Sequence, residues 1–118
     1  MSNNASKTEV SQAKIIAHTI LMQMGGYGAL NIMAGAYDIT SRLRGVSFSY
    51  KGSKKTNRVA IELEHTDLYT VTFFKVSKPG LKNYLSCDIV KEVKRFEDIG
   101  AEGLIDLFEK ETGIYLRI

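Results

Sequence analysis

The sequence contains little of what disulfide-stapled or membrane-embedded proteins need. Its one cysteine, Cys87, cannot form an internal disulfide, which excludes a disulfide framework. No apolar run approaches the about 20 residues of a membrane-spanning helix, and no stretch combines the features of a secretory signal peptide. We therefore expect a cytoplasmic protein with no membrane partner.

Residues that carry catalytic or metal chemistry are equally scarce. His65 lies between Glu64 and Asp67, a combination that can bind a metal ion or relay a proton, but no second histidine or cysteine is near it in sequence. Cys87 would need a base beside it to act as a nucleophile. Residues 52–56 lack the glycine spacing of a phosphate-binding loop. We predict no enzyme activity, no metal site and no cofactor.

The size and composition are those of one globular domain. The chain has 118 residues, of which 44% are hydrophobic and 25% are charged, and this is enough to bury a core without staples. No internal repeat or linker divides it. We predict a single domain over residues 1–118, with residues 1–5 disordered because they are polar and terminal.

The clearest structural signal is a β-hairpin over residues 57–76. Apolar side chains occupy every second position of both arms, and a period of two places them on one face of a sheet. A symmetrical turn at residues 64–67 would place Leu63 opposite Tyr69 or a near neighbour. Phe74 and Val76 fall on the other face, so either a bulge redirects them or helices cover both faces, and we expect the second.

The N-terminal half predicts one helix and further strands. A capping box at Ser6 and Glu9 starts an amphipathic helix, and Gly25-Gly26 ends it. Residues 27–36 are interpreted as a strand, because glycine weakens a helix by about 1 kcal/mol relative to alanine, although a short helix remains open. Residues 38–44 form a connection of undecided structure, and residues 46–50 alternate as a strand.

The C-terminal half follows the only proline, Pro79, which marks a turn. Residues 84–95 are interpreted as a strand, with a helix left open because the periodicity fits both. An apolar stripe over residues 101–108 predicts a last helix, with Asp98 as its cap and Gly113 as its stop. The tail over residues 114–118 alternates and should dock in extended form. The fold class is α+β, an antiparallel sheet of four or five strands with an N-terminal and a C-terminal helix packed on it.

The net charge of +3 is unevenly distributed. Residues 1–84 contain 11 Lys and Arg against 5 Asp and Glu, a net charge of +6, whereas residues 85–118 have a net charge of −3. Between Arg42 and Arg58, inclusive, there are six basic residues and no acidic one. Such a stretch attracts phosphate groups or an acidic protein surface.

Several short motifs occur in a fixed order along most of the chain. They are Met24-Gly25-Gly26, Met33-Ala34-Gly35-Ala36, Asn57-x-Val59-x-Ile61-x-Leu63, Asp67-x-Tyr69-x-Val71-x-Phe73 and Thr112-Gly113-Ile114-Tyr115-Leu116. In this order they resemble a group of small, mostly uncharacterised proteins encoded by phages and integrated mobile elements. The sequence departs from that pattern in the basic residues 51–56 and in the segment after Pro79. The resemblance implies a viral or mobile-element setting inside a host cell, and it supplies no catalytic residue.

We predict a non-enzymatic accessory protein that binds nucleic acid, DNA or RNA, or a nucleoprotein machine through its basic surface. Tyr50 directly precedes Lys51 and could stack on a base of a single strand, although such a tyrosine more commonly packs at the edge of a small core. The predicted nucleic-acid-binding residues are Arg42, Arg44, Tyr50, Lys51, Lys54, Lys55, Arg58, Lys75, Lys78 and Lys82.

The alternative is a protein-interaction or inhibitor module that targets a host or viral protein. The last helix carries an acidic face made by Glu102, Asp106, Glu109 and Glu111. This face could pair with the basic loop of a second copy, which would favour a homodimer.

Overall fold

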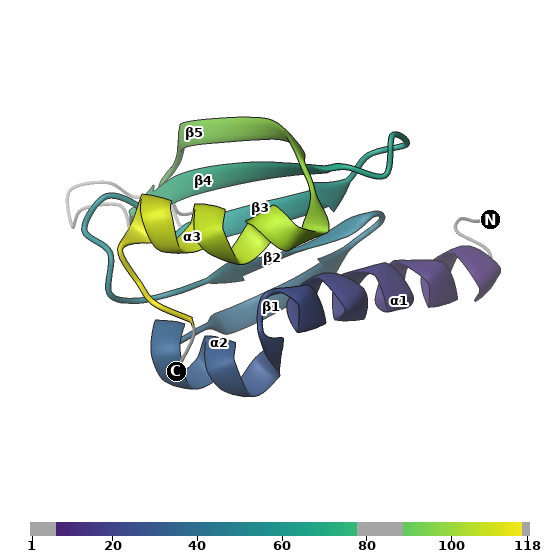
Figure 1. Cartoon of the computed structure of the whole chain (residues 1–118), viewed down its shortest axis with the longest axis horizontal. Coiled ribbons are helices and arrows are strands. Elements are labelled where there is room, and N and C mark those ends of the chain that lie inside the picture. The colour runs from purple at the N-terminus through teal and green to yellow at the C-terminus, as the bar shows by residue number, and fades with distance from the viewer. Residues whose placement is uncertain (1–6, 78–88, 117–118) are drawn as a thin grey trace.

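The computed structural model describes residues 7–77 and 89–116 and shows an antiparallel sheet with its helices on one side (Figure 1). The elements are α1 (Lys7–Gln23), α2 (Gly26–Ala34), β1 (Tyr37–Arg42), β2 (Gly45–Ser49), β3 (Arg58–Leu63), β4 (Tyr69–Ser77), β5 (Ile89–Ile99), a 3-10 turn η1 (Ala101–Gly103) and α3 (Leu104–Thr112). The five strands lie in sequence order, each antiparallel to the next. This confirms the predicted α+β class and the antiparallel sheet with a helix from each end of the chain.

The hairpin of β3 and β4 has the register that the alternation predicts. Leu63 pairs with Tyr69, and the next core positions along the hairpin pair in the same way, Ile61 with Val71 and then Val59 with Phe73. β2 continues the pattern across the sheet, because its apolar side chains pair with the same β3 positions. All these side chains are on the face that α1 and α3 cover, where they form the core with Leu21 and Phe108.

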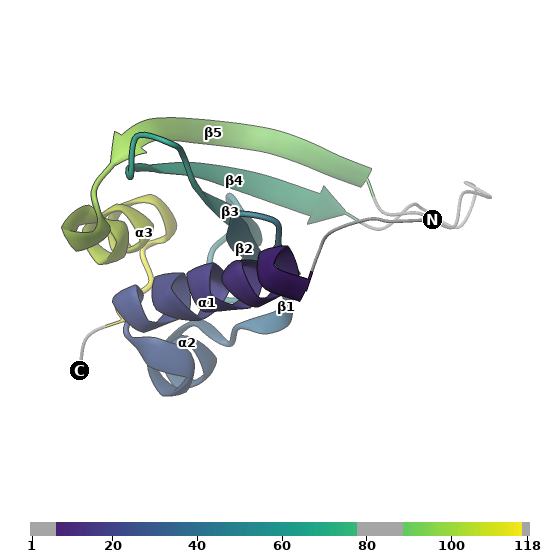
Figure 2. The ribbon, with the colours of Figure 1, turned by 90° about the vertical axis from the view of Figure 1, so that its right-hand side faces the viewer.

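The sheet curves around α1 and α3, and no helix of the described residues lies on its other face (Figure 2). The expectation of helices on both faces is therefore wrong. The helix-free face consists of short side chains in the middle of the sheet, Ser47 on β2, Ala60 on β3 and Thr72 on β4, which are side by side in the register. These three side chains are buried, and Phe74 on the same face is partly buried, although no described helix covers them.

The strand prediction for residues 27–36 is wrong, because Gly26–Ala34 forms helix α2. Gly25 and Gly26 adopt φ of 107° and 89°, so they turn the chain between α1 and α2. Leu30 and Ala34, one turn apart, are fully buried, and this burial offsets the low helix propensity of the glycines. Gly35 ends the helix with a left-handed cap.

Three further boundaries differ from the sequence interpretation. The undecided residues 38–44 include edge strand β1, which has a bulge at Asp38. The predicted strand over residues 84–95 is a strand from Ile89 onward, while residues 84–88 lie outside the described part of the chain. Asp98 does not cap a helix. It lies near the end of β5 with φ of 58°, and α3 begins only after the 3-10 turn.

The two ends of the chain contribute to the fold as far as they are described. Ser6 of the predicted capping box and residues 1–5 lie outside the described residues, as does Ile118. Gly113 ends α3 with φ of 75°, as predicted. In the tail, Ile114 and Leu116 are buried, and the Leu116 N–H donates a hydrogen bond to Glu109 Oε2 at 2.8 Å.

Replacing Ile61 with alanine should lower the free energy of unfolding by about 2–5 kcal/mol, because Ile61 is fully buried in the centre of the sheet. Glu62→Ala is the matched control on the opposite face. It removes only an exposed ion pair to Arg42 at 3.8 Å and should cost less than about 1 kcal/mol. Chemical denaturation measures both variants, and equal small losses would contradict the assigned register.

Candidate functional site

The predicted basic residues lie at two ends of the sheet. Arg42 and Arg44 are at the turn between β1 and β2, whereas the loop that carries Lys54 and Lys55 is at the other end of β2 (Figure 1). Six residue steps from Arg44 to Tyr50, at about 3.3 Å each, separate the two ends by about 20 Å. The basic stretch is therefore not one continuous surface.

The turn arginines contact their own neighbours. Arg42 Nε lies 3.8 Å from Glu62 Oε2, and Arg44 Nε donates a hydrogen bond to the Leu63 carbonyl at 3.0 Å. These contacts tie the β1–β2 turn to the adjacent end of β3. They give both arginines a local structural role at this turn.

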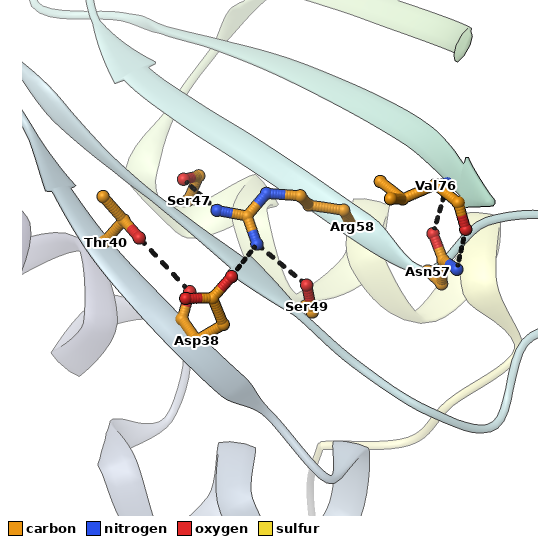
Figure 3. Close-up of polar contacts among 7 residues, drawn as sticks. All are labelled: Asp38, Thr40, Ser47, Ser49, Asn57, Arg58 and Val76. Atoms are coloured by element: carbon orange, nitrogen blue, oxygen red, sulfur yellow. Dashed lines mark hydrogen bonds and ion pairs between the residues drawn. The ribbon is translucent and has the colours of Figure 1, made fainter. Parts of the chain in front are cut away.

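Arg58 extends across the helix-free face of the sheet and bonds to three side chains (Figure 3). It donates to Ser49 Oγ at 2.8 Å and to Ser47 Oγ at 2.9 Å, and its guanidinium lies 3.2 Å from Asp38 Oδ2. The guanidinium thus binds both serine hydroxyls of β2 and the bulge residue of β1. Arg58 stabilises the register of three strands, and a phosphate would have to compete with these bonds.

Tyr50 lies in the core and is only 1% exposed. Its ring packs edge-on against Phe108, with ring centroids 5.1 Å apart, and its hydroxyl is hydrogen-bonded to Thr56 Oγ1. The ring therefore offers no face on which a nucleic-acid base could stack. Of the two interpretations of Tyr50 from sequence, stacking on a base and packing in a small core, the geometry supports packing.

Lys51 points to the β1 side of the sheet. Its Nζ lies 5.4 Å from the centre of the Tyr37 ring, a cation–π distance, and its backbone N–H donates to the Ala34 carbonyl at 2.9 Å. It is thereby separated from the other lysines of its loop. Lys78, Lys82 and Cys87 lie outside the described residues.

Lysines from four segments of the chain come together where β4 ends and β5 begins. This lysine-rich end is made of Lys54 and Lys55 on the β2–β3 loop, Lys75 on β4, Lys91 and Lys94 on β5, and Lys110 on α3. Lys75 and Lys91 are directly opposite each other in the β4–β5 register. Lys75 Nζ also contacts the Lys54 carbonyl oxygen at 3.4 Å.

A pocket of about 210 Å³ lies within the lysine-rich end, between the sheet, the β2–β3 loop and the last turn of α3. We call it the lysine pocket, and its lining residues are Lys55, Thr56, Phe73, Val93, Lys94, Lys110 and Glu111. Lys94 Nζ lies 3.4 Å from Glu111 Oε1. The pocket combines three ammonium groups and one carboxylate with the apolar side chains of Phe73 and Val93.

Sequence reasoning missed Lys91, Lys94 and Lys110, because they belong to the segment with a net negative charge. Only the pairing of β4 with β5 brings Lys91 beside Lys75, and only the packing of α3 brings Lys110 beside Lys55. The alternation of residues 89–95 was the available signal. It gave a strand, but it did not give that strand's partner or register.

Among the described residues, the candidate metal ligand His65 has no cluster of further ligands around it. His65 is exposed in the β3–β4 turn, and no three His, Cys, Asp or Glu residues of the described chain are grouped closely enough to hold a metal ion. None of the described helices has the length and apolar character needed to cross a membrane. No known family model matches the chain, and neither a curated protein nor a solved structure shows significant similarity to it.

Tyr50→Phe should change stability in a pH-dependent way. Burial raises the pKa of Tyr50 to about 12, from an ordinary value of 10.0. The folded protein therefore keeps this proton more tightly than the unfolded chain, and stability should fall as the pH rises from 10 to 12, by up to about 2–3 kcal/mol. Below pH 10 the variant should lose about 0.5–1.5 kcal/mol with the Thr56 hydrogen bond.

Denaturation of both proteins between pH 8 and pH 12 measures this effect. The variant should lose less stability than the wild type above pH 10. Burial also raises the pKa of Tyr69, so some alkaline loss should remain in the variant. Parallel pH profiles for the two proteins would contradict the burial of the Tyr50 hydroxyl.

Proposed function

We propose that this protein is a non-enzymatic accessory protein that binds the phosphate backbone of nucleic acid through its lysine-rich end. The observation that carries the proposal is the convergence of six lysines from a loop, two strands and a helix on one end of the sheet. Lysine is a point-charge donor well suited to phosphate. The resemblance to phage and mobile-element proteins supports a viral or mobile-element setting in the host cytoplasm.

The arrangement of the lysines supports a ligand of opposite charge. Like charges that face each other across two strands are destabilising, and Lys75 and Lys91 do so directly. Lys54, Lys55 and Lys110 add further positive charge at this end, whereas Lys94 is paired with Glu111. An anionic ligand would remove this repulsion, so the cost in stability is consistent with a binding surface.

Contacts between lysine side chains and backbone phosphates position a protein on nucleic acid without reading its sequence. Tyr50, the one aromatic side chain predicted to stack on bases, is buried. We therefore propose binding that is independent of sequence and strongly dependent on salt. We leave four predicted residues out of the proposed surface because their contacts lie elsewhere, with β3, β2, β1 and α2: Arg42, Arg44, Lys51 and Arg58.

A second candidate function is supported by apolar side chains that are exposed on α1, on α2 and at β1. Ile15 and Met22 on α1, Tyr27 on α2, and Ile39 and Leu43 at β1 are all at least 40% exposed. These elements pack against one another, and exposed apolar side chains on neighbouring elements are typical of a protein-interaction surface. A host or viral protein, or a second copy of this chain, would be the partner.

Affinity for a DNA or RNA oligonucleotide should fall with salt, with a log–log slope of about −0.7 to −0.9 for each phosphate contact. Four contacts give a slope of about −3. Replacing Lys54 and Lys55 together with glutamate should weaken binding to all sequences alike and should reduce the slope by about 1.5. Fluorescence anisotropy at several salt concentrations measures both quantities.

The matched control replaces Lys14 and Arg42 with glutamate, which changes the net charge by the same amount at sites away from the lysine-rich end. This variant should keep nearly the wild-type slope. Equal effects of the two double variants would show that only net charge matters. No binding to any oligonucleotide at low salt would overturn the proposed function in favour of a protein partner.

A further inference from the structure

The lysine pocket differs from the rest of the lysine-rich end because it is partly enclosed. Its walls come from the β2–β3 loop, from β4 and β5, and from the last turn of α3. Phe73, which is only 1% exposed, and Val93 supply its apolar part. A nucleic-acid strand that passes over a surface needs two open sides, whereas a walled pocket suits a group at the end of a chain.

The size of the pocket selects a small group. Its volume is about 210 Å³. Sites for drug-sized ligands occupy about 300–1,000 Å³. The pocket is smaller than such sites, and it can hold a phosphate group and the first atoms attached to it.

The charge of the pocket selects a dianion. Lys55, Lys94 and Lys110 carry three positive charges, and Glu111, which pairs with Lys94, carries one negative charge, so the lining has a net charge of +2. A phosphomonoester carries about −1.5 to −2 at pH 7. An internal phosphodiester carries only about −1 and would leave the lining partly uncompensated.

One feature of the pocket opposes an anion. Lys110 and Glu111 belong to the last turn of α3, and a helix C-terminus carries a partial charge of about −0.5. The Gly113 N–H donates to the Glu109 carbonyl and occupies one of the end carbonyls. The remaining partial charge is small beside the net +2 of the lining side chains.

We propose that the lysine pocket binds the terminal phosphomonoester of a nucleic-acid strand. This inference rests on the proposed function and deepens it: the lysines outside the pocket lining, Lys54, Lys75 and Lys91, hold the backbone, while Lys55 and Lys110 bind the phosphate at the strand end. The preferred ligand is then the end of a nucleic-acid strand, and not the interior of a duplex or of a single strand.

Oligonucleotides that differ only at their ends test the inference. A strand with a terminal phosphate should bind about tenfold more tightly than the same strand with hydroxyl ends, a difference of about 1.4 kcal/mol from one or more charge-assisted hydrogen bonds. The phosphate is placed in turn at the 5′ and the 3′ end. If the wild-type protein binds the phosphorylated strand no more tightly than the hydroxyl-ended strand, with the phosphate at either end, the inference is overturned.

Three variants separate the pocket from the surface around it. Lys110→Gln removes one ammonium group, and Val93→Phe fills the pocket without changing its charge. In both variants, the oligonucleotide with a terminal phosphate should bind about as tightly as the one with hydroxyl ends. Lys75→Gln, which is at the lysine-rich end but outside the pocket lining, should weaken both oligonucleotides equally and keep the preference. Lys94 is left unchanged because it also pairs with Glu111.

The outcomes distinguish the two proposals. Salt-dependent binding without an end preference would overturn the pocket inference and leave the proposed function intact. A preference that survives both Lys110→Gln and Val93→Phe would place the end site elsewhere and would also overturn the inference. A phosphoserine peptide is the other phosphomonoester to test. If it binds and no oligonucleotide does, both proposals fail in favour of a phosphorylated protein partner.

Discussion

The pairing of β3 with β4 is the constraint on which the rest of the structure depends. It places Val59 opposite Phe73 and Ile61 opposite Val71 on the face covered by α1 and α3. A slip of one residue would move these side chains to the helix-free face and bring Arg58 and Glu62 into the core, which is far too costly to occur. β2 and β5 then add to the two sides of this hairpin, each antiparallel to its neighbour.

Both edges of the sheet carry irregularities that limit pairing with another chain. The β1–β2 register shifts at Asp38, and the β4–β5 register shifts twice. Asp38 and Asp98 adopt left-handed φ of 53° and 58° at these edges. Bulges of this kind twist an edge strand away from a partner. Continuation of the sheet into a second chain is therefore disfavoured at both edges.

The sequence predicts the elements that have strict periodicity and fails where packing decides. The hairpin of residues 57–76 follows from alternation, and the α+β class follows from this alternation together with the helical periodicity near both ends of the chain. Residues 27–36 do not, because the burial of Leu30 and Ala34 against the rest of the fold outweighs the glycine content. Asp98 is a reasonable N-cap by type, but its strand continues to Ile99 and a 3-10 turn intervenes. The helix and strand propensities of the residue types do not reveal which side chains become buried or where a strand ends.

In the candidate site, too, the sequence predicts some of the residues and tertiary packing decides the others. Lys54, Lys55 and Lys75 were identified from a local excess of basic residues, and the structure keeps them together. Arg58 has the same charge, yet it binds Ser47, Ser49 and the bulge, because its strand position directs it to the helix-free face. The lysines that complete the site come from a segment that is acidic on average. Charge along a sequence therefore indicates that a basic surface exists, but the strand register decides which residues belong to it.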